Sequence, residues 1–155
     1  MEPRAPINGV PFHAWEKFVS VMVLAPKTHV SPRNRLGTFQ MDPKRLKDIG
    51  AIKEVKKNEL GAWEGKWSSG LTQSDFLGSL PLQYATFVRS VRAMAPKVSG
   101  LVGSEVDGKK ASLSGLLGVG HIAGEVGVFG WVSSADERRR FGRTTEMFDK
   151  TNGIF

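Results

Sequence analysis

The stretch from Ser114 to Trp131, SGLLGVGHIAGEVGVFGW, is the most unusual part of the sequence. It holds six glycines, one histidine, one glutamate and no other charged residue. An interior glycine costs a helix about 0.5–1 kcal/mol relative to alanine, so several together indicate that neighbouring elements approach closely. We therefore predict a buried central helix. Its bulk comes from Leu116, Leu117, Ile122, Val126 and Phe129, and its small face from Gly120, Gly124 and Gly127.

Two other interpretations of this stretch fail. A dinucleotide loop would follow a buried strand, but the preceding DGKKASLS, residues 107–114, has the composition of a turn, and the chain has no Gly-Lys-Ser/Thr of a phosphate loop. A membrane span needs about 20 apolar residues, and the charge-free run of residues 111–124 is shorter and diluted by glycine. We expect neither a nucleotide cofactor nor a membrane span.

Length and charge set the class of protein. With 155 residues and 40% apolar residues, the chain is expected to form one globular domain, and the absence of cysteine excludes disulfides and thiolate metal sites. The formal net charge of +7 favours an anionic partner, unless the basic surface serves solubility alone. The first residues show no signal-peptide pattern. The prolines of residues 1–11 predict an extended arm, followed by a domain over residues 12–155.

Apolar spacing and capping residues predict a mainly α-helical domain of five to seven helices. Asp42, Pro43 and Gly50 have the residue types of an N-cap, a first helical position and a C′ position. Residues 51–70 are ambiguous, and we expect them to end in a loop that carries Trp63 and Trp67. The Asp107-Gly108 turn suits a small β-hairpin. We expect helices over residues 12–24, 43–49, about 72–78 and 81–95, over the central stretch, and briefly near residues 134–140 and 144–151.

Four stretches, taken in order, resemble the lysozyme-like domains of phages and bacteria that are related to soluble lytic transglycosylases. The glycine-rich stretch resembles the central helix of that family, and LGTFQM, residues 36–41, resembles its G-x-Y-Q segment. Residues 63–87 and 141–153 resemble its Trp-containing region and its closing segment. The four matches together span residues 36–153.

The resemblance implies a helical lysozyme-like fold with a cleft for the glycan of peptidoglycan. Phe39 and Gln40 would lie near that cleft, and Thr144 and Thr145 would line it. From the residues alone, Gln40 can equally be a polar residue beside a helix, and the threonines can be helix caps.

The acid that the resemblance requires is missing. Glycan cleavage needs a carboxylic acid that protonates the glycosidic oxygen, and the family places a Glu at the end of its first long helix. The matching residues 20–25, SVMVLA, contain no acid. Glu16 and Glu125 are the nearest candidates for a catalytic role. Glu16 can instead be a surface residue, and Glu125 can be a surface acid or part of a buried ion pair.

No other catalytic or metal-binding pattern is present. His29 and His121 have no partner acids at ligand spacing, so we expect no metal site and no cofactor. Ser114, His121 and Asp136 could be named as a triad, but no nucleophile-elbow sequence supports them.

These observations favour a phage virion protein of the tail or baseplate, made in the host cytoplasm, that binds peptidoglycan glycan during envelope penetration and cleaves it if an acid is present. The alternative is a catalytically inactive structural protein that uses the same fold to contact other tail or baseplate proteins. A nucleic-acid-binding module ranks last. Its basis is the basic loop of residues 26–35 and the run Arg138 to Arg140, without a nucleic-acid-binding motif.

Overall fold

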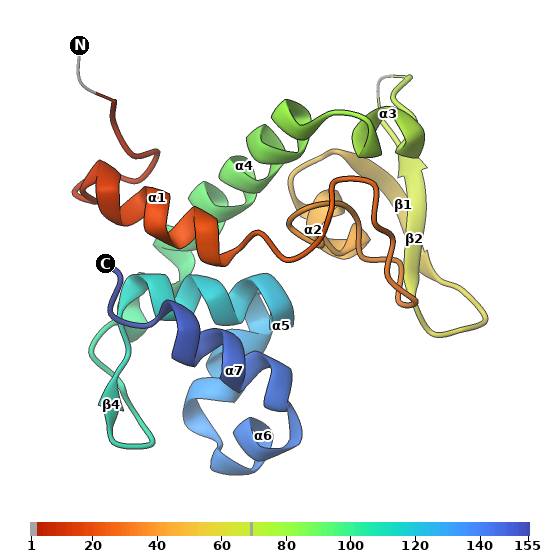
Figure 1. Cartoon of the computed structure of the whole chain (residues 1–155). Helices are drawn as coiled ribbons and strands as arrows, with labels where there is room; N and C mark the ends of the chain where they lie inside the picture. The colour runs from red at the N-terminus through yellow and green to blue at the C-terminus, as the bar shows by residue number, and fades with distance from the viewer. Residues whose placement is uncertain (1–2, 69) are drawn as a thin grey trace. The chain divides into compact units, whose positions relative to one another are not determined.

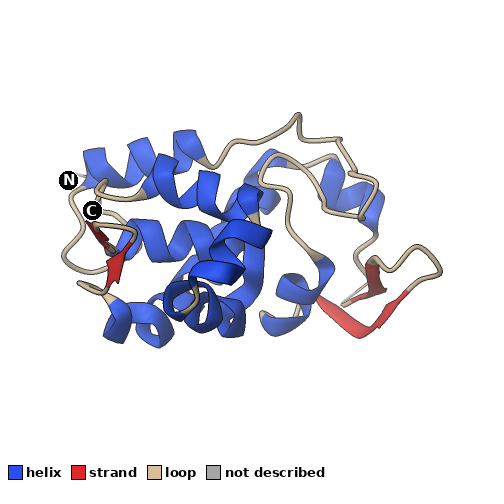
Figure 2. Ribbon diagram, turned by 90° about the horizontal axis from the view of Figure 1, so that it is seen from below, coloured by secondary structure: helices blue, strands red, loops and turns tan. Residues whose placement is uncertain are grey.

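The computed structural model describes residues 3–68 and 70–155. Their regular structure consists of seven α-helices, one short 3₁₀ helix and two antiparallel hairpins, drawn in Figure 1 and coloured by type in Figure 2. The mainly α-helical class and the small hairpin at Asp107-Gly108 are confirmed. The chain divides into two compact units, for which the sequence shows no boundary. Unit 1 holds the described residues up to Met22 together with Val91–Phe155, and unit 2 holds Val23–Ser90.

Unit 1 is built around the glycine-rich helix. That helix, α5 (Leu113–Ser133), runs beside α7 (Gly142–Thr151), as Figure 1 shows. The ring of Trp131 packs on Phe148 at 4.9 Å, and Phe18 meets the C-terminal Phe155 edge-on at 5.3 Å. The other elements of unit 1 are α1 (Phe12–Val21), the end of α4 (Leu80–Val98), η1 (Ser99–Leu101), β3 (Glu105–Val106), β4 (Lys109–Lys110) and α6 (Ala135–Arg140).

The prediction of a buried central helix holds for the first half of α5. Ser112 caps it by accepting from the backbone N–H of Gly115, and residues 114–121 are buried. At Gly124 the backbone leaves the helix, with φ +81° and ψ +163°. Beyond this break Val126 is 87% exposed and Phe129 is 48% exposed. The second half of the helix is therefore only partly covered.

α5 is also the one helix, among the described residues, that is long and apolar enough to cross a bilayer by length and composition. The fold buries 56% of the relevant stretch. Burial of this kind is what the core helix of a folded domain shows, and such helices pass the same test.

The glycines of α5 serve two different purposes. A Cβ atom on Gly115 or Gly118 would strike the side chain of Asn152 or Thr151, so these glycines allow α7 to approach. Gly120 faces the flexible end of Met94. The prediction that Gly124 serves close packing is wrong, because nothing lies within 4 Å of its Cβ position and its positive φ marks the break instead.

Unit 2 combines short helices with one hairpin. Its elements are α2 (Pro43–Asp48), β1 (Ile52–Lys57), β2 (Trp63–Trp67), α3 (Gln73–Leu77) and the start of α4. Asp42 caps α2 as predicted, and Gly50 has a φ of +79° after its end. Thr72 and Asp75 form a reciprocal capping box on α3. Phe39 stacks on Phe87 at 4.4 Å in the core of the unit.

The expected loop at Trp63 and Trp67 is wrong, because these residues are the two ends of strand β2. β2 pairs antiparallel with β1, and Trp67 lies opposite the buried Ile52. The lysine-rich composition of β1 hides this strand, since its only buried residue is Ile52. The strand conformation of β1 therefore depends on its pairing with β2, because its own residues have a weak β-strand propensity.

Two predicted helix ends are also wrong. α1 ends at Val21 rather than Leu24, since Met22 already caps it and Val23 is exposed. α4 continues through Pro96 to Val98, beyond the predicted end at Ala95. Pro96 lies in the last turn, so the hydrogen bond that proline removes affects only the helix end.

Candidate functional site

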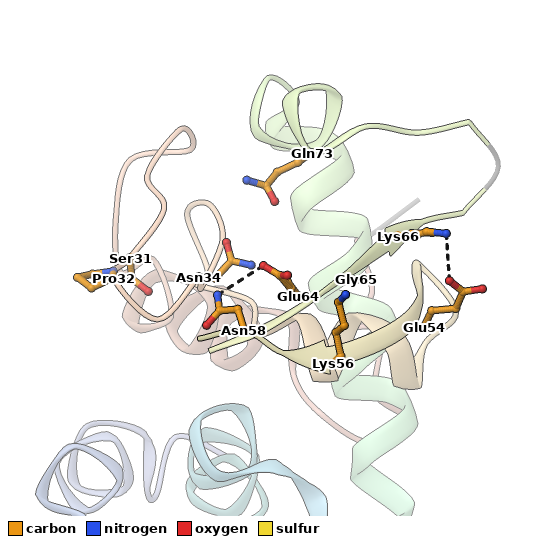
Figure 3. Close-up of a pocket in the computed structure, with 10 residues that line it drawn as sticks. All are labelled: Ser31, Pro32, Asn34, Glu54, Lys56, Asn58, Glu64, Gly65, Lys66 and Gln73. Atoms are coloured by element: carbon orange, nitrogen blue, oxygen red, sulfur yellow. Dashed lines mark hydrogen bonds and ion pairs between the residues drawn. The ribbon is translucent and has the colours of Figure 1, made fainter. Parts of the chain in front are cut away.

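An open polar pocket of about 750 Å³ lies within unit 2. It is formed by the loop before α2, the β1–β2 hairpin and the start of α3 (Figure 3). Amide, hydroxyl, carboxylate and ammonium groups line it: Ser31, Pro32, Asn34, Glu54, Lys56, Asn58, Glu64, Gly65, Lys66 and Gln73. Such a wall offers hydrogen-bond donors and acceptors side by side.

The loop is fastened to the hairpin by Asn34. Its side-chain amide donates to the backbone carbonyl of Trp63 at 3.0 Å. Asn34 has a φ of +59°, a conformation that asparagine tolerates better than most residues. The loop closes on itself through the N–H of Asn34, which donates to the carbonyl of Ser31 at 2.9 Å. These contacts give the pocket a defined wall on the loop side.

Asn58 shapes the turn of the hairpin and orients the carboxylate of Glu64. Its side-chain oxygen accepts from the backbone N–H groups of Leu60 and Ala62 at 2.9 and 3.0 Å. Its amide nitrogen lies 3.5 Å from Oε2 of Glu64, which makes this a long and weak hydrogen bond. Figure 3 shows Glu64 directed toward Asn58. One carboxylate of the pocket is thus held beside amide groups.

The second carboxylate lies at an irregularity of the hairpin. The register of β1 and β2 shifts between Lys53 and Lys56, and Glu54 within this bulge has a φ of +52°. Glu54 pairs with Lys66 at 3.2 Å, with side chains that are 70% and 81% exposed. An ion pair this exposed adds little stability. Its charges remain open to solvent and to a ligand.

The pocket is chemically suited to bind a hydroxyl-rich ligand. Two glutamates and two lysines balance its charge, and the amides of Asn34, Asn58 and Gln73 add neutral donors and acceptors. Sugar hydroxyls both donate and accept, so they match a wall of mixed character better than a wall of one charge. Of the described glutamates, Glu54 and Glu64 are the two that line this pocket.

Phe39 and Gln40, the residues predicted for a cleft, lie inside unit 2. They are 2% and 4% exposed. The side-chain amide of Gln40 donates to the backbone carbonyl of Gly37 at 2.9 Å and to that of His29 at 3.4 Å. This placement makes Gln40 a brace for its loop, and neither residue lines the pocket.

Thr144 and Thr145, the other predicted substrate-binding residues, belong to unit 1. Thr144 is buried. The hydroxyl of Thr145 donates to the carbonyl of Arg138 at 2.9 Å and lies 3.3 Å from the indole nitrogen of Trp131. Thr145 thus joins α5, α6 and α7. Neither threonine is the N-cap that the residue type suggests, because α7 begins at Gly142 after Phe141 and has no side-chain cap.

The two predicted catalytic acids also lie in unit 1 and not in the pocket. Glu16 is exposed on α1. Glu125 follows the break at Gly124, and its carboxylate pairs with Lys97 at 2.8 Å while its side chain is 17% exposed. The ion pair as a whole is not buried, because the side chain of Lys97 is 59% exposed, so Glu125 is a partly covered acid of the helix surface. Glu54 and Glu64 were not predicted as site residues, although the alternation in WEGKW, residues 63–67, is a strand signal that places Glu64 in a hairpin.

Ser114 and Asp136, two residues of the nominal triad, have structural contacts of their own. The hydroxyl of Ser114 donates to the carbonyl of Thr151 at 2.7 Å and accepts from the N–H of Phe155 at 3.0 Å. Asp136 pairs with Arg139 on the surface of α6. Over residues 3–68 and 70–155, no three His, Asp or Glu side chains gather as metal ligands would.

Comparison of the chain with family models, curated proteins and solved structures found no match. The pocket and its surroundings are therefore the features of this chain that bear on its function.

Proposed function

We propose that this chain is a lysozyme-like component of a phage particle, in the tail or baseplate, that binds the glycan strands of peptidoglycan as the particle penetrates the cell envelope. The polar pocket of unit 2 carries the proposal. Its amides and carboxylates suit the hydroxyl and acetamido groups of an amino-sugar chain. Its volume of about 750 Å³ is in the range of sites that hold small ligands.

Glycan binding and glycan cleavage are two distinct properties, and the proposal concerns binding. A glycosidase needs one acid to protonate the leaving oxygen and a second carboxylate as base or nucleophile. Glu54 and Glu64 are the acids that a ligand in the pocket would meet. Glu16 and Glu125 lie in unit 1. Variants of all four glutamates are therefore needed to test for glycan cleavage.

The binding experiment measures co-sedimentation with purified sacculi and titration with a soluble N-acetylglucosamine oligomer. Gln73→Ala and Glu64→Gln should each weaken binding severalfold, because each removes a polar group from the wall of the pocket. Glu59→Gln is the matched control, since Glu59 is exposed near the hairpin turn and outside the pocket. Equal affinity of all three variants and the unmodified protein would exclude the pocket as the glycan site.

Release of dye from labelled sacculi tests cleavage. Turnover that is lost in Glu64→Gln or Glu54→Gln would assign the chemistry to the pocket. Turnover lost in Glu16→Gln or Glu125→Gln would assign it to the acids that the sequence suggested. Binding without turnover would define a protein that holds glycan and does not cut it.

The structural alternative draws on the exposed apolar residues of unit 1. Val126 is 87% exposed, and Phe129 and Phe141 are 48% and 50% exposed. Apolar side chains of this size in contact with solvent are frequent at protein–protein interfaces. Under this alternative the chain would bind other tail or baseplate proteins, Val126→Ser with Phe129→Ser would abolish assembly into the particle, and sacculi would not be bound.

A further inference from the structure

A second group of side chains in unit 2 has a different chemistry from the pocket. The ammonium groups of Lys44 and Lys57 lie 5.0 and 5.3 Å from the ring centroid of the same indole, Trp63. Lys44 comes from α2, and Lys57 lies directly opposite Trp63 in the hairpin register. We call these three residues the lysine–tryptophan cluster. Their positions place the two cations no more than about 10 Å apart, close to one Debye length in physiological salt.

Acidic side chains of the described chain do not neutralise this cluster. The ion pairs of residues 3–68 and 70–155 include neither Lys44 nor Lys57. Asp42 accepts from the backbone N–H of Lys44, as a helix cap. The exposed Lys47 lies three residues after Lys44 on the same side of α2 and adds a third cation. Asp48, four residues after Lys44, is paired with Arg45 at 3.5 Å. The cluster is therefore a local excess of positive charge.

The charge of the whole unit reinforces this excess. Residues 23–90 hold seven lysines and four arginines against three aspartates and three glutamates, a net charge of +5 out of the +7 of the chain. A surface with this sign attracts polyanions and raises their rate of encounter. Lysine binds phosphate oxygens as a compact point charge, and arginine binds them through its planar fork, so either residue type is compatible with a phosphate ligand.

The surroundings of Trp63 and Trp67 distinguish two classes of polyanionic ligand, namely nucleic acid and phosphate polymers without bases. Single-stranded nucleic acid is held by aromatic rings on which its bases stack. Here Lys44 and Lys57 lie over the ring of Trp63, which is half-buried, and Trp67 packs on Phe76 at 5.0 Å. Both rings therefore already have packing partners within unit 2, and we expect neither to serve as a stacking platform for bases. The cluster fits phosphate groups and not bases.

We propose that the lysine–tryptophan cluster binds a phosphodiester-linked polymer without bases, of the kind built from repeating polyol phosphates. Lys44 and Lys57 contact successive phosphates of the polymer, and Trp63 holds these two lysines in place. Lys47 adds to the positive electrostatic potential of the surface. This surface is additional to the glycan pocket, because the ligand it binds needs no sugar.

The test is binding of an end-labelled glycerol-phosphate oligomer to the full chain, followed by fluorescence anisotropy across a range of NaCl concentrations. Affinity should fall steeply with salt, since each neutralised phosphate contributes about −0.7 to the slope of log K against log salt for a flexible strand. Lys44→Gln with Lys57→Gln should lower affinity at least tenfold at low salt. It should also make the slope shallower by about 1.4, which is the contribution of two phosphates.

The matched control is Lys17→Gln with Lys110→Gln, which removes the same charge from exposed lysines of unit 1. It should change affinity less than threefold. Lys44→Arg with Lys57→Arg should retain binding, which shows that any loss in the glutamine pair comes from charge and not from misfolding.

Three results would overturn the proposal. They are an equal loss in both glutamine pairs, no binding of the oligomer at low salt, and tighter binding of an oligothymidylate of equal charge than of the glycerol-phosphate oligomer. The last result would assign the cluster to nucleic acid. None of them bears on glycan binding, so the two proposals fail independently.

Discussion

The side-chain carbonyl of Gln83 accepts a hydrogen bond from the backbone N–H of Thr38 at 2.8 Å, across 45 residues of sequence. The amide nitrogen of the same side chain donates to the carbonyls of Lys27 and Phe76 at 2.8 and 2.9 Å. Gln83 is 1% exposed. One buried amide on α4 thus ties together three backbone segments of unit 2, two of which lead into the walls of the pocket.

Gln83→Leu should destabilise the chain by at least about 2 kcal/mol, because it leaves a backbone N–H and two carbonyls buried without their partner. The free energy of unfolding in urea measures the loss. Gln83→Glu should also destabilise, since it keeps the acceptor for Thr38 and loses both donated bonds. Gln73→Leu is the control, and its effect should stay under about 0.5 kcal/mol because Gln73 is partly exposed. Equal stability of the two leucine variants would contradict this role for Gln83.

Gly118→Ala should cost about 1–3 kcal/mol through overpacking. Its new Cβ would meet Thr151, whose side chain is held by a hydrogen bond to the carbonyl of Met147 at 2.7 Å and is fully buried. Thermal unfolding measures the loss. Gly100→Ala provides the comparison, because nothing lies within 4 Å of its Cβ position. If both substitutions have the same effect, the close approach of α5 and α7 does not require the glycine.

Gly124→Ala should also destabilise, but for a backbone reason. The φ of +81° and ψ of +163° lie in a region that is almost restricted to glycine, and a side chain there costs about 1–3 kcal/mol. Gly124→Asn should be no better, because asparagine favours the left-handed helical region and not this one. A neutral effect in chemical denaturation would mean that α5 can run straight through residue 124.

Stability should depend on pH through Asp107. Two hydrogen bonds of 3.0 Å from the guanidinium of Arg138 hold the pKa of Asp107 below its ordinary value of 3.8. A carboxylate whose pKa is lowered by folding stabilises the protein above its unfolded pKa, and this contribution disappears as pH falls through the folded pKa. Asp107→Asn should therefore lower the Tm at neutral pH, and this effect should shrink as the pH falls below 3.8 and through the lowered pKa of folded Asp107.

Glu146 provides a parallel case for the same measurement. Lys150 lies 2.9 Å from its carboxylate one helical turn later, and the hydrogen bond between them lowers the pKa of Glu146. Glu146→Gln should show the same disappearance of its effect at acid pH. A Tm difference that grows toward acid pH in either variant would contradict the assigned direction of the pKa.

Much of the helical structure could be predicted because its signals are local. The side chains of Asp42, Thr72 and Ser112 cap the helices that follow them, as their residue types indicate. The turn at Asp107 and Gly108 forms the predicted hairpin. Each of these features depends on residues a few positions apart, so a single segment contains the whole signal.

The candidate site could not be predicted in this way. The wall of the pocket joins residues 31–34 to residues 54–66 and Gln73, and only the folded chain brings these segments together. Phe39 and Gln40 were expected near a ligand because of the family resemblance. Instead, Phe39 packs against Phe87 and the Gln40 amide donates to a backbone carbonyl, both inside unit 2. Burial of a polar side chain depends on what covers it, and residue type alone does not give that.

Local signals in the sequence account for the helical class, several capped helix starts, the Asp107-Gly108 hairpin and the burial of the first part of the glycine-rich stretch, because caps, turns and apolar spacing act over short distances. The tertiary structure alone decided the rest. The structure shows that Gly118 allows close packing, whereas Gly124 lies at a break in the helix. It also shows that two lysines from different elements contact the ring of Trp63. It also gathered the pocket. The physical reason is that these features depend on which distant segments pack together, and their residue types are compatible with more than one such arrangement.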